Sequence, residues 1–97
     1  MKFEWNRRKE QINIKKHGVS FSQASSIFSD PYALSQYDDE HSHDEDRWAL
    51  LGKASNEVIL IVVHTMKDAN GLEIVRIISA RKATKKEIQM YQKRCFK

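Results

Sequence analysis

The sequence predicts an α+β fold in which a short N-terminal strand and two helices precede an antiparallel sheet of about four strands and a C-terminal helix. Three patterns support this class: two helix-capping signals before residue 31, an apolar β-branched run at residues 58–66, and a hairpin signal, DANG, at residues 68–71. The chain has 97 residues, of which 40% are hydrophobic. This suits a single domain over residues 1–97 with a modest core.

The first helix is expected to follow a short strand at residues 2–5 and to run to about residue 16. Asn6 can cap its first turn, and Gly18 can end it because glycine tolerates positive φ. The helix is polar almost throughout, so Ile12 and Ile14 are the side chains expected to face inward.

A second helix is predicted from the spacing of Ser20 and Gln23, which is that of a capping box. Apolar side chains recur at helical spacing over residues 24–28, and Pro31 ends the segment. The two helices therefore precede the sheet.

Strand patterns fill most of the remaining chain. Residues 32–37 predict an edge strand, residues 38–46 a charged loop, and residues 47–54 an alternating strand. The run at residues 58–66 is apolar on both faces, which predicts a central strand covered on both sides. After the hairpin, residues 73–81 return antiparallel to it.

The C-terminal helix is predicted to open with a second capping box, formed by Thr84 and Glu87. Ile88, Tyr91 and Cys95 lie on one stripe of this helix and are expected to face the sheet.

Charge is divided unevenly along the chain. The net charge is +4; residues 30–46 carry mainly acidic groups, whereas residues 76–97 carry cations with one carboxylate. Such a field favours a polyanion on one surface, although charge runs are often only solvated faces. The single cysteine allows no internal disulfide, and neither a membrane-spanning run nor a signal peptide is present, so we expect a cytoplasmic location.

Cations also occur within the predicted strands. Arg47 and Lys53 share one face of their strand, and Arg76 lies in an apolar strand. Each could be paired with a structural carboxylate, but several together favour a phosphate ligand, which arginine binds through two parallel donors. Arg76 and Arg81 have opposite parity, so they reach one ligand only if the strand ends or bulges near Ala80.

Other chemistry has weaker support. His41 and His43 alternate with carboxylates, but a solvated loop explains them more simply than a metal site, and no metal or cofactor is expected. No hydrolase or nucleotide-binding motif occurs. His17 lies at a helix C-terminus, where the helix dipole favours the protonated ring.

Three segments carry a resemblance to a known family: FEWNRRKEQINIKKHGVSFSQASSIFSDP, HSHDEDRWALLG and RIISARKATKKEIQMY. They resemble the BrnT toxin family of bacterial type II toxin–antitoxin modules, whose pattern includes K-H-G-V-x-F, H-S-x-x-E-x-R and R-I-I-S-A-R-K-A-T. The resemblance covers nearly the whole chain. Asn6 stands where many relatives carry aspartate, a change that keeps the helix cap.

The resemblance implies a RelE-like fold and a ribonuclease that inhibits translation by cutting RNA. It also implies neutralisation by a BrnA-type antitoxin, through which alone the complex would contact operator DNA. RelE-like enzymes rely mainly on lysine and arginine, so the cleavage is expected to need no metal.

Such a ribonuclease needs a base for the ribose 2′-hydroxyl, cations for the phosphorane and an acid for the leaving 5′-oxygen. Arg76, Arg81 and Lys53 are the candidates for the phosphate, and His64, Glu87 and Tyr91 for proton transfer, although capping and core roles compete at the last two. Further RNA-binding candidates are Arg47, Lys82, Lys85, Lys86 and His17.

A different class of function fits the same charges. A small basic protein can bind RNA, DNA or another chain without cutting a bond, since a basic patch supplies affinity in either case. A catalytically inactive relative of the toxins is the corresponding evolutionary alternative.

Overall fold

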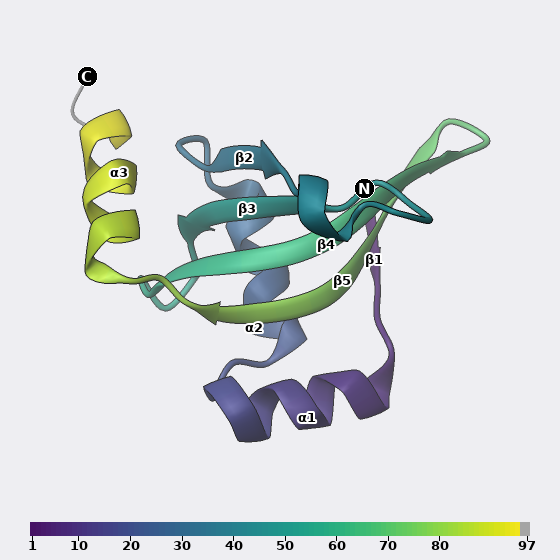
Figure 1. The fold of residues 1–97 in the computed structure, drawn as a ribbon, viewed down its shortest axis with the longest axis horizontal. Coiled ribbons are helices and arrows are strands. Elements are labelled where there is room, and N and C mark those ends of the chain that lie inside the picture. The colour runs from purple at the N-terminus through teal and green to yellow at the C-terminus, as the bar shows by residue number, and fades with distance from the viewer. Residues whose placement is uncertain (96–97) are drawn as a thin grey trace.

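A five-stranded mixed sheet forms the centre of the computed structural model, which describes residues 1–95 (Figure 1). The elements in chain order are β1 (Lys2–Glu4), α1 (Arg7–His17), α2 (Phe21–Ser25), the 3-10 turn η1 (Ser26–Ser29), β2 (Leu34–Tyr37), the 3-10 turn η2 (Asp39–His41), β3 (Trp48–Lys53), β4 (Ile59–Ala69), β5 (Leu72–Lys82) and α3 (Lys85–Cys95). No helix in this part of the chain is long and apolar enough to cross a membrane.

The strand order is β1-β5-β4-β3-β2, and β2 to β5 pair antiparallel, as predicted. The short N-terminal strand joins the same sheet, parallel to β5, with Lys2 opposite Ile74 and Glu4 opposite Arg76. The predicted α+β class is confirmed. The sheet contains four antiparallel strands, β2 to β5, and its fifth strand is the short N-terminal strand β1.

Local sequence signals explain where the first elements begin and end. The Asn6 side chain accepts a hydrogen bond from the Lys9 N–H (3.0 Å), and Gly18 closes α1 at φ +70°. The Ser20 hydroxyl caps α2 through the Gln23 N–H (3.1 Å). In the hairpin between β4 and β5, Asn70 and Gly71 both adopt positive φ, as its two-residue turn requires.

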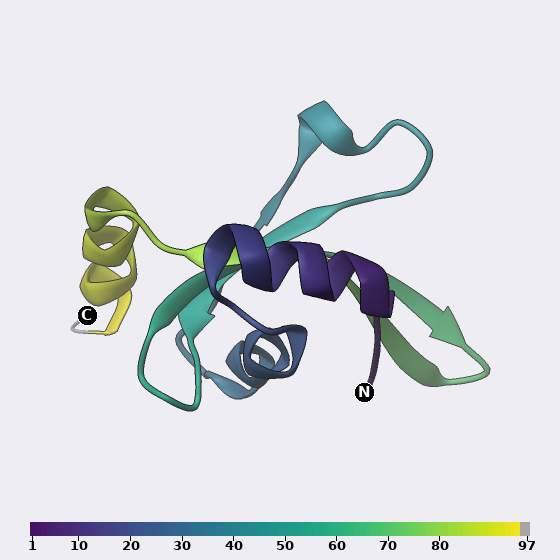
Figure 2. The ribbon, with the colours of Figure 1, turned by 90° about the horizontal axis from the view of Figure 1, so that it is seen from below.

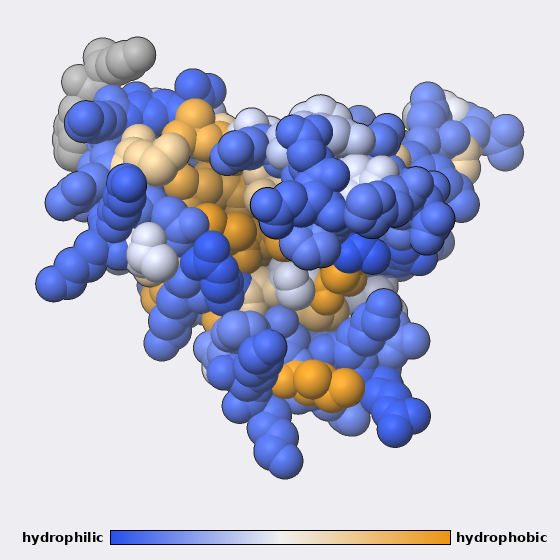
Figure 3. Space-filling model, viewed as in Figure 1, coloured by the Kyte–Doolittle hydropathy of each residue, from blue (hydrophilic) through white to orange (hydrophobic). Residues whose placement is uncertain are grey.

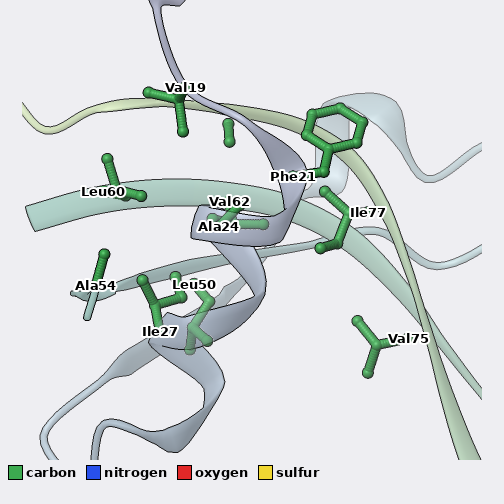
Figure 4. Close-up of a cluster of buried hydrophobic side chains, with 11 residues drawn as sticks. Val19, Phe21, Ala24, Ile27, Leu50, Ala54, Leu60, Val62, Val75 and Ile77 are labelled. Carbon is green, nitrogen blue, oxygen red and sulfur yellow. The ribbon is translucent and has the colours of Figure 1, made fainter. Parts of the chain in front are cut away.

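The hydrophobic core lies on the face of the sheet that α2 covers (Figures 2 and 4). Side chains from α2, η1, three strands and two connecting segments form it: Val19, Phe21, Ala24, Ile27, Leu50, Ala54, Leu60, Val62, Val75, Ile77 and Ala80. Gly52 permits the close approach of η1, because a Cβ there would lie 3.2 Å from the Cβ atoms of both Ala33 and Ile27.

The opposite face, which we call the open face, is only partly covered. Residues 39–47 pass over it at one end and α3 stands at the other (Figures 1 and 2). Leu60 and Val62 of β4 are buried on the α2 side, whereas Ile61 and Val63, on the open face, are half-buried. The prediction that this strand is covered on both sides was therefore wrong, because only one helical layer packs on the sheet.

The inward face of α1 also differs from the prediction. Ile12 and Ile14 are 59% and 44% exposed, and the buried residue of the helix is Asn13. Its amide nitrogen donates to the carbonyl oxygens of Val19 (2.9 Å) and Ala80 (2.8 Å), and its oxygen accepts from the Ala80 N–H (3.1 Å). Asn13 thus pairs with the edge of β5 beyond the end of β1, as a neighbouring strand would.

At the C-terminal end, Tyr91 of α3 is buried and Ile88 is half-buried, as the predicted stripe requires. The side chain of Cys95, expected on the same stripe, lies outside the described part of the structure.

Replacing Asn13 with alanine should destabilise the fold by about 2–4 kcal/mol, because three backbone groups in a buried setting lose their partner. Ile12→Ala is the matched control and should change the unfolding free energy by no more than about 0.5 kcal/mol, since that side chain is mostly exposed. Urea unfolding of both variants measures the difference. Equal stabilities would show that the Asn13 bridge contributes nothing.

Candidate active site on the open face of the sheet

Arg76 and Arg81 lie on the same face of the sheet because β5 contains a bulge. Ser79 is opposite Val63, but Ile77 is opposite His64, so Ile78 is the extra residue. The bulge lies two residues before Ala80, close to where the parity of the two arginines required one.

The two arginines occupy opposite ends of the open face. Arg76 is opposite Thr65 and Arg81 is opposite Ile61 on β4. Four residues of strand separate these positions, which corresponds to about 13 Å at the usual rise per residue. The arginines are therefore spaced to contact different phosphates of one extended polyanion.

At the first end, Arg76 forms an ion pair with a carboxylate. Its Nη2 donates to Oε1 of Glu45, a residue of the segment that passes over the open face, and both side chains are about half exposed. Glu4 of β1 is directly opposite Arg76 in the sheet. These three residues line a hollow of about 280 Å³ together with Asp46, Thr65, Met66, Lys67 and Ile74.

Arg47 lies next to this ion pair, and its Nε is buried without a hydrogen-bond partner among the residues that the structure describes. An unpaired buried donor costs about 1–3 kcal/mol, so a bound acceptor would stabilise this side chain. A second hollow of about 220 Å³ is lined by Arg47, Glu45, His41, His43 and Asp44. Glu45 borders both hollows.

The segment that carries Glu45 is held by its own backbone. The Asp38 N–H donates to the Arg47 carbonyl (2.9 Å), and the Arg47 N–H donates to the Ser42 hydroxyl oxygen (3.0 Å). The Ser42 hydroxyl in turn donates to the Asp38 carbonyl (2.5 Å). These bonds close residues 38–47 into a loop that lies over the sheet. The sequence predicts a solvated loop here but not its internal hydrogen bonds.

At the second end, Arg81 forms a bidentate ion pair with Glu87 (2.9 and 3.0 Å). Glu87 also accepts from the Thr84 N–H (2.8 Å), and its own N–H donates to the Thr84 hydroxyl oxygen (3.2 Å), which completes the predicted capping box. The hydrogen bonds from Arg81 lower the pKa of Glu87 to about 2, despite partial burial. Glu87 is therefore ionised at neutral pH and holds no proton to donate.

Tyr91 and Lys53 meet at Asp30. The Tyr91 hydroxyl donates to Asp30 Oδ2 (2.5 Å), and so does the Lys53 backbone N–H (2.8 Å). Burial opposes ionisation of Asp30, but the hydrogen bonds from Tyr91, Lys53 and Tyr32 outweigh it and lower the pKa. These contacts fix α3 beside the end of β3, which is a structural role for Tyr91. The Lys53 side chain remains exposed on the side of the open face.

His64 lies on the other side of the sheet. Its side chain is 1% exposed, its ring packs edge-on to Phe28 at 4.8 Å between centroids, and Nδ1 lies 3.2 Å from the Val62 carbonyl oxygen. Burial lowers its pKa, so the ring is neutral. Because it cannot reach a ligand on the open face, His64 is better explained as a core residue than as a proton-transfer group.

The remaining candidates are spread over the surface. Lys82, Lys85 and Lys86 are exposed at the end of β5 and the start of α3, near Arg81. His17 is half-buried at the C-terminal end of α1, in the helical layer and away from the Arg76–Glu45 pair.

Sequence reasoning missed Glu45 and Glu4 as members of the site. Glu45 was assigned to a solvated acidic loop, although it is the glutamate of the H-S-x-x-E-x-R pattern that ends in Arg47. That spacing was the available signal. Nothing in the sequence indicated Glu4, which reaches the site only through the parallel pairing of β1 with β5.

Carboxylates within the chain neutralise the arginines of the open face. Arg76 and Arg81 each have a carboxylate partner in the chain, so neither requires an anionic ligand for neutralisation. Over residues 1–95, no three His, Cys, Asp or Glu side chains gather as metal ligands. The open face thus offers carboxylate–arginine pairs, which suit general-base catalysis and phosphate binding.

Comparisons with known proteins agree with this architecture. The family model described as ribonuclease toxin, BrnT, of type II toxin–antitoxin system matches residues 5–87. A crystal structure of the Brucella abortus ribonuclease toxin BrnT is similar at 26% identity and a TM-score of 0.59, with 88% of this chain and 99% of that chain covered. No curated protein matches significantly.

The charge on Glu87 should stabilise the fold only above acidic pH. The folded pKa of about 2 lies below the ordinary value of 4.5, so this stabilisation is complete above 4.5 and disappears as the pH falls towards 2. Glu87→Gln keeps an oxygen for the Thr84 N–H but removes the charge. We expect it to be less stable than the parent by about 1 kcal/mol at neutral pH, because the pair is partly exposed, and equally stable near pH 2. A difference that does not vary with pH in urea unfolding would contradict this.

Proposed function

Because the chain belongs to the BrnT family of ribonuclease toxins of type II toxin–antitoxin systems, we propose that it cuts RNA on the open face of its sheet. The cut would inhibit translation, and a BrnA-type antitoxin would neutralise the protein. One observation carries the proposal: a carboxylate, Glu45, is paired with Arg76 beside a third group, Arg47, whose Nε–H has no partner in the described structure.

Cleavage of RNA by its own 2′-hydroxyl requires a base, an acid and cations at the phosphate. The ribose 2′-hydroxyl loses its proton to a base and attacks the adjacent phosphorus, a pentacoordinate phosphorane forms, and the bond to the 5′-oxygen breaks as that oxygen gains a proton. The products are a 2′,3′-cyclic phosphate and a 5′-hydroxyl end.

We assign the base to Glu45. Its carboxylate is half exposed, borders both hollows and is held at Arg76, which would bind the phosphate through the remaining guanidinium donors. Arg47 would add a donor to the phosphorane oxygens. His41 and His43 line the same hollow as Arg47, and we assign to them the protonation of the 5′-oxygen.

The second end of the open face would hold more of the RNA strand. Lys53, Lys82, Lys85 and Lys86 are exposed there, and no ion pair involving them is present among the described residues. With the Arg81–Glu87 pair they form a basic margin about 13 Å from the Arg76 position. Contacts to neighbouring phosphates at this margin would supply affinity without taking part in the chemistry.

A binding module without turnover is the second candidate. The specific observation in its favour is that Arg76 and Arg81 are already neutralised by carboxylates, as purely structural arginines are. Growth arrest and RNA loss on expression in a bacterium distinguish the two, because an inert binder causes neither.

Arg76→Ala should lower the rate of RNA cleavage by about 10²–10³-fold and relieve toxicity, because the phosphorane loses its main cation. The fold should survive, since the Arg76–Glu45 pair is half exposed. Arg8→Ala, an exposed arginine on α1, is the matched control and should cleave like the parent. If Arg76→Ala instead lost its cooperative thermal transition, Arg76 would be a structural residue.

Glu45→Gln should lower cleavage by about 10²–10⁴-fold, because the amide cannot take the 2′-hydroxyl proton. RNA affinity should persist, since Arg47 and Arg76 remain. Asp39→Asn removes an exposed carboxylate of the same loop and should have little effect. A fluorescent RNA oligonucleotide reports both cleavage and binding. Full activity in Glu45→Gln would exclude Glu45 as the base.

Cleavage should continue in excess EDTA, because arginines replace the metal as the source of positive charge at the phosphate. The measurement compares cleavage rates before and after chelation of the purified protein. Loss of activity on chelation, with recovery on addition of zinc or manganese, would overturn a metal-independent reaction.

A further inference from the structure

A groove separates α3 from the open face of the sheet, at the end away from the Arg76–Glu45 pair. It has a volume of about 340 Å³ and is lined by Leu34, Ser35, Gln36, Ala49, Leu51, Ile61, Glu87 and Met90. None of these residues borders the hollows around Glu45. Figure 3 shows hydrophobic surface between α3 and the segment over the open face, with hydrophilic surface on both sides.

The lining of the groove is mainly aliphatic. Leu51 and Ile61 belong to neighbouring strands, where they are opposite each other, and Met90 projects from α3 with 52% of its surface exposed. No aromatic ring is among the described residues that line it. Bases of single-stranded RNA are usually held by stacking on aromatic rings, whereas aliphatic walls with a flexible methionine fit aliphatic side chains of a protein.

The attachment of α3 explains why the groove is not filled. Tyr91 is tied to Asp30 and Glu87 is tied to Arg81, so the helix is fixed beside the end of the sheet. Met90 adjoins both contacts in the helix but lines the groove and is half exposed. These two polar contacts therefore fix the helix that forms one wall of the groove.

Positive charge borders the groove along α3. Lys86 precedes Met90 by four residues and Arg94 follows it by four, so all three lie on one side of the helix, and both cations are exposed. From residue 81 to residue 94 the chain has six cations and one carboxylate. An aliphatic strip with cations at both ends is complementary to a segment whose aliphatic residues are flanked by aspartate or glutamate.

We propose that this groove receives aliphatic side chains of an acidic segment of the antitoxin. The inference rests on the proposed function for the existence of that partner and adds the surface and the chemistry by which it binds. In this arrangement Met90 and Ile61 contact the buried side chains of the partner, and Lys86 and Arg94 pair with carboxylates at the rim. The bound segment lies over the basic margin that the RNA strand would use, so the two ligands compete.

The test uses the full chain and, as the probe, the protein encoded by the gene next to that of this chain. Met90→Asp places a carboxylate in the groove and should weaken binding at least about tenfold, as loss of a central interface residue does. Gln89→Asp adds the same charge at the exposed neighbouring position and should weaken it no more than about threefold. Titration calorimetry measures both affinities, and thermal unfolding verifies both folds.

Ala49→Leu provides a variant without charge. Ala49 is half-buried in the lining, so leucine there fills the groove and should also weaken binding of the partner. Both groove variants should cleave RNA like the parent when the partner is absent, because neither residue belongs to the Glu45 site. Because two different substitutions probe the groove, the test remains decisive even if one of the variants does not fold.

Several results would overturn the proposal. Parental affinity in Met90→Asp and Ala49→Leu, equal losses in Met90→Asp and Gln89→Asp, or no binding of the partner by the parent chain would each do so. Loss of RNA cleavage or RNA affinity in the groove variants would assign the groove to RNA. If the parent chain binds the partner through the groove but cuts no RNA, the proposed ribonuclease activity fails while this inference stands.

Discussion

The hydrogen bonds between Asn13 and the edge of β5 hold the two layers of the protein together. β1 pairs with β5 only at residues 74–76, so the outer edge of β5 lacks a strand where Asn13 meets Ala80. The amide supplies both a donor and an acceptor there and also binds the Val19 carbonyl, which fixes the chain between α1 and α2. Because α1 and α2 both lie on the core side of the sheet, neither helix covers the open face.

The bulge at Ile78 is the reason that the open face carries both arginines of β5. Without it, Arg76 and Arg81 would project to opposite sides of β5, and one of them would point into the core. With it, both lie on the open face, and each is neutralised by a carboxylate from a different element: Glu45 from the loop over the sheet and Glu87 from α3. The same ion pairs hold Glu45 beside Arg76 on the open face and fix α3 beside the end of β5.

Much of the fold could be predicted from local signals. The caps at Asn6 and Ser20 and the positive φ at Asn70 and Gly71 depend on neighbouring residues alone, and each was found where the sequence indicated it. Ile12, Ile14 and the cover over residues 58–66 were mispredicted because burial depends on which face receives a partner layer. A hydrophobic pattern cannot reveal that when a polar side chain such as Asn13 makes the contact.

The sequence by itself determined the order of the elements, the basic C-terminal third and the family pattern, because these reside in composition and in spacings of a few residues. Only the tertiary structure decided which charges meet. Glu45 and Arg76 are 31 residues apart, Glu4 lies opposite Arg76 through a parallel pairing, and His64 is buried because Leu60, Val62 and His64 share the face of β4 that the helices cover. Each of these outcomes depends on strand register and on which face the helices cover, since shifting a strand by one residue moves every side chain to the other face.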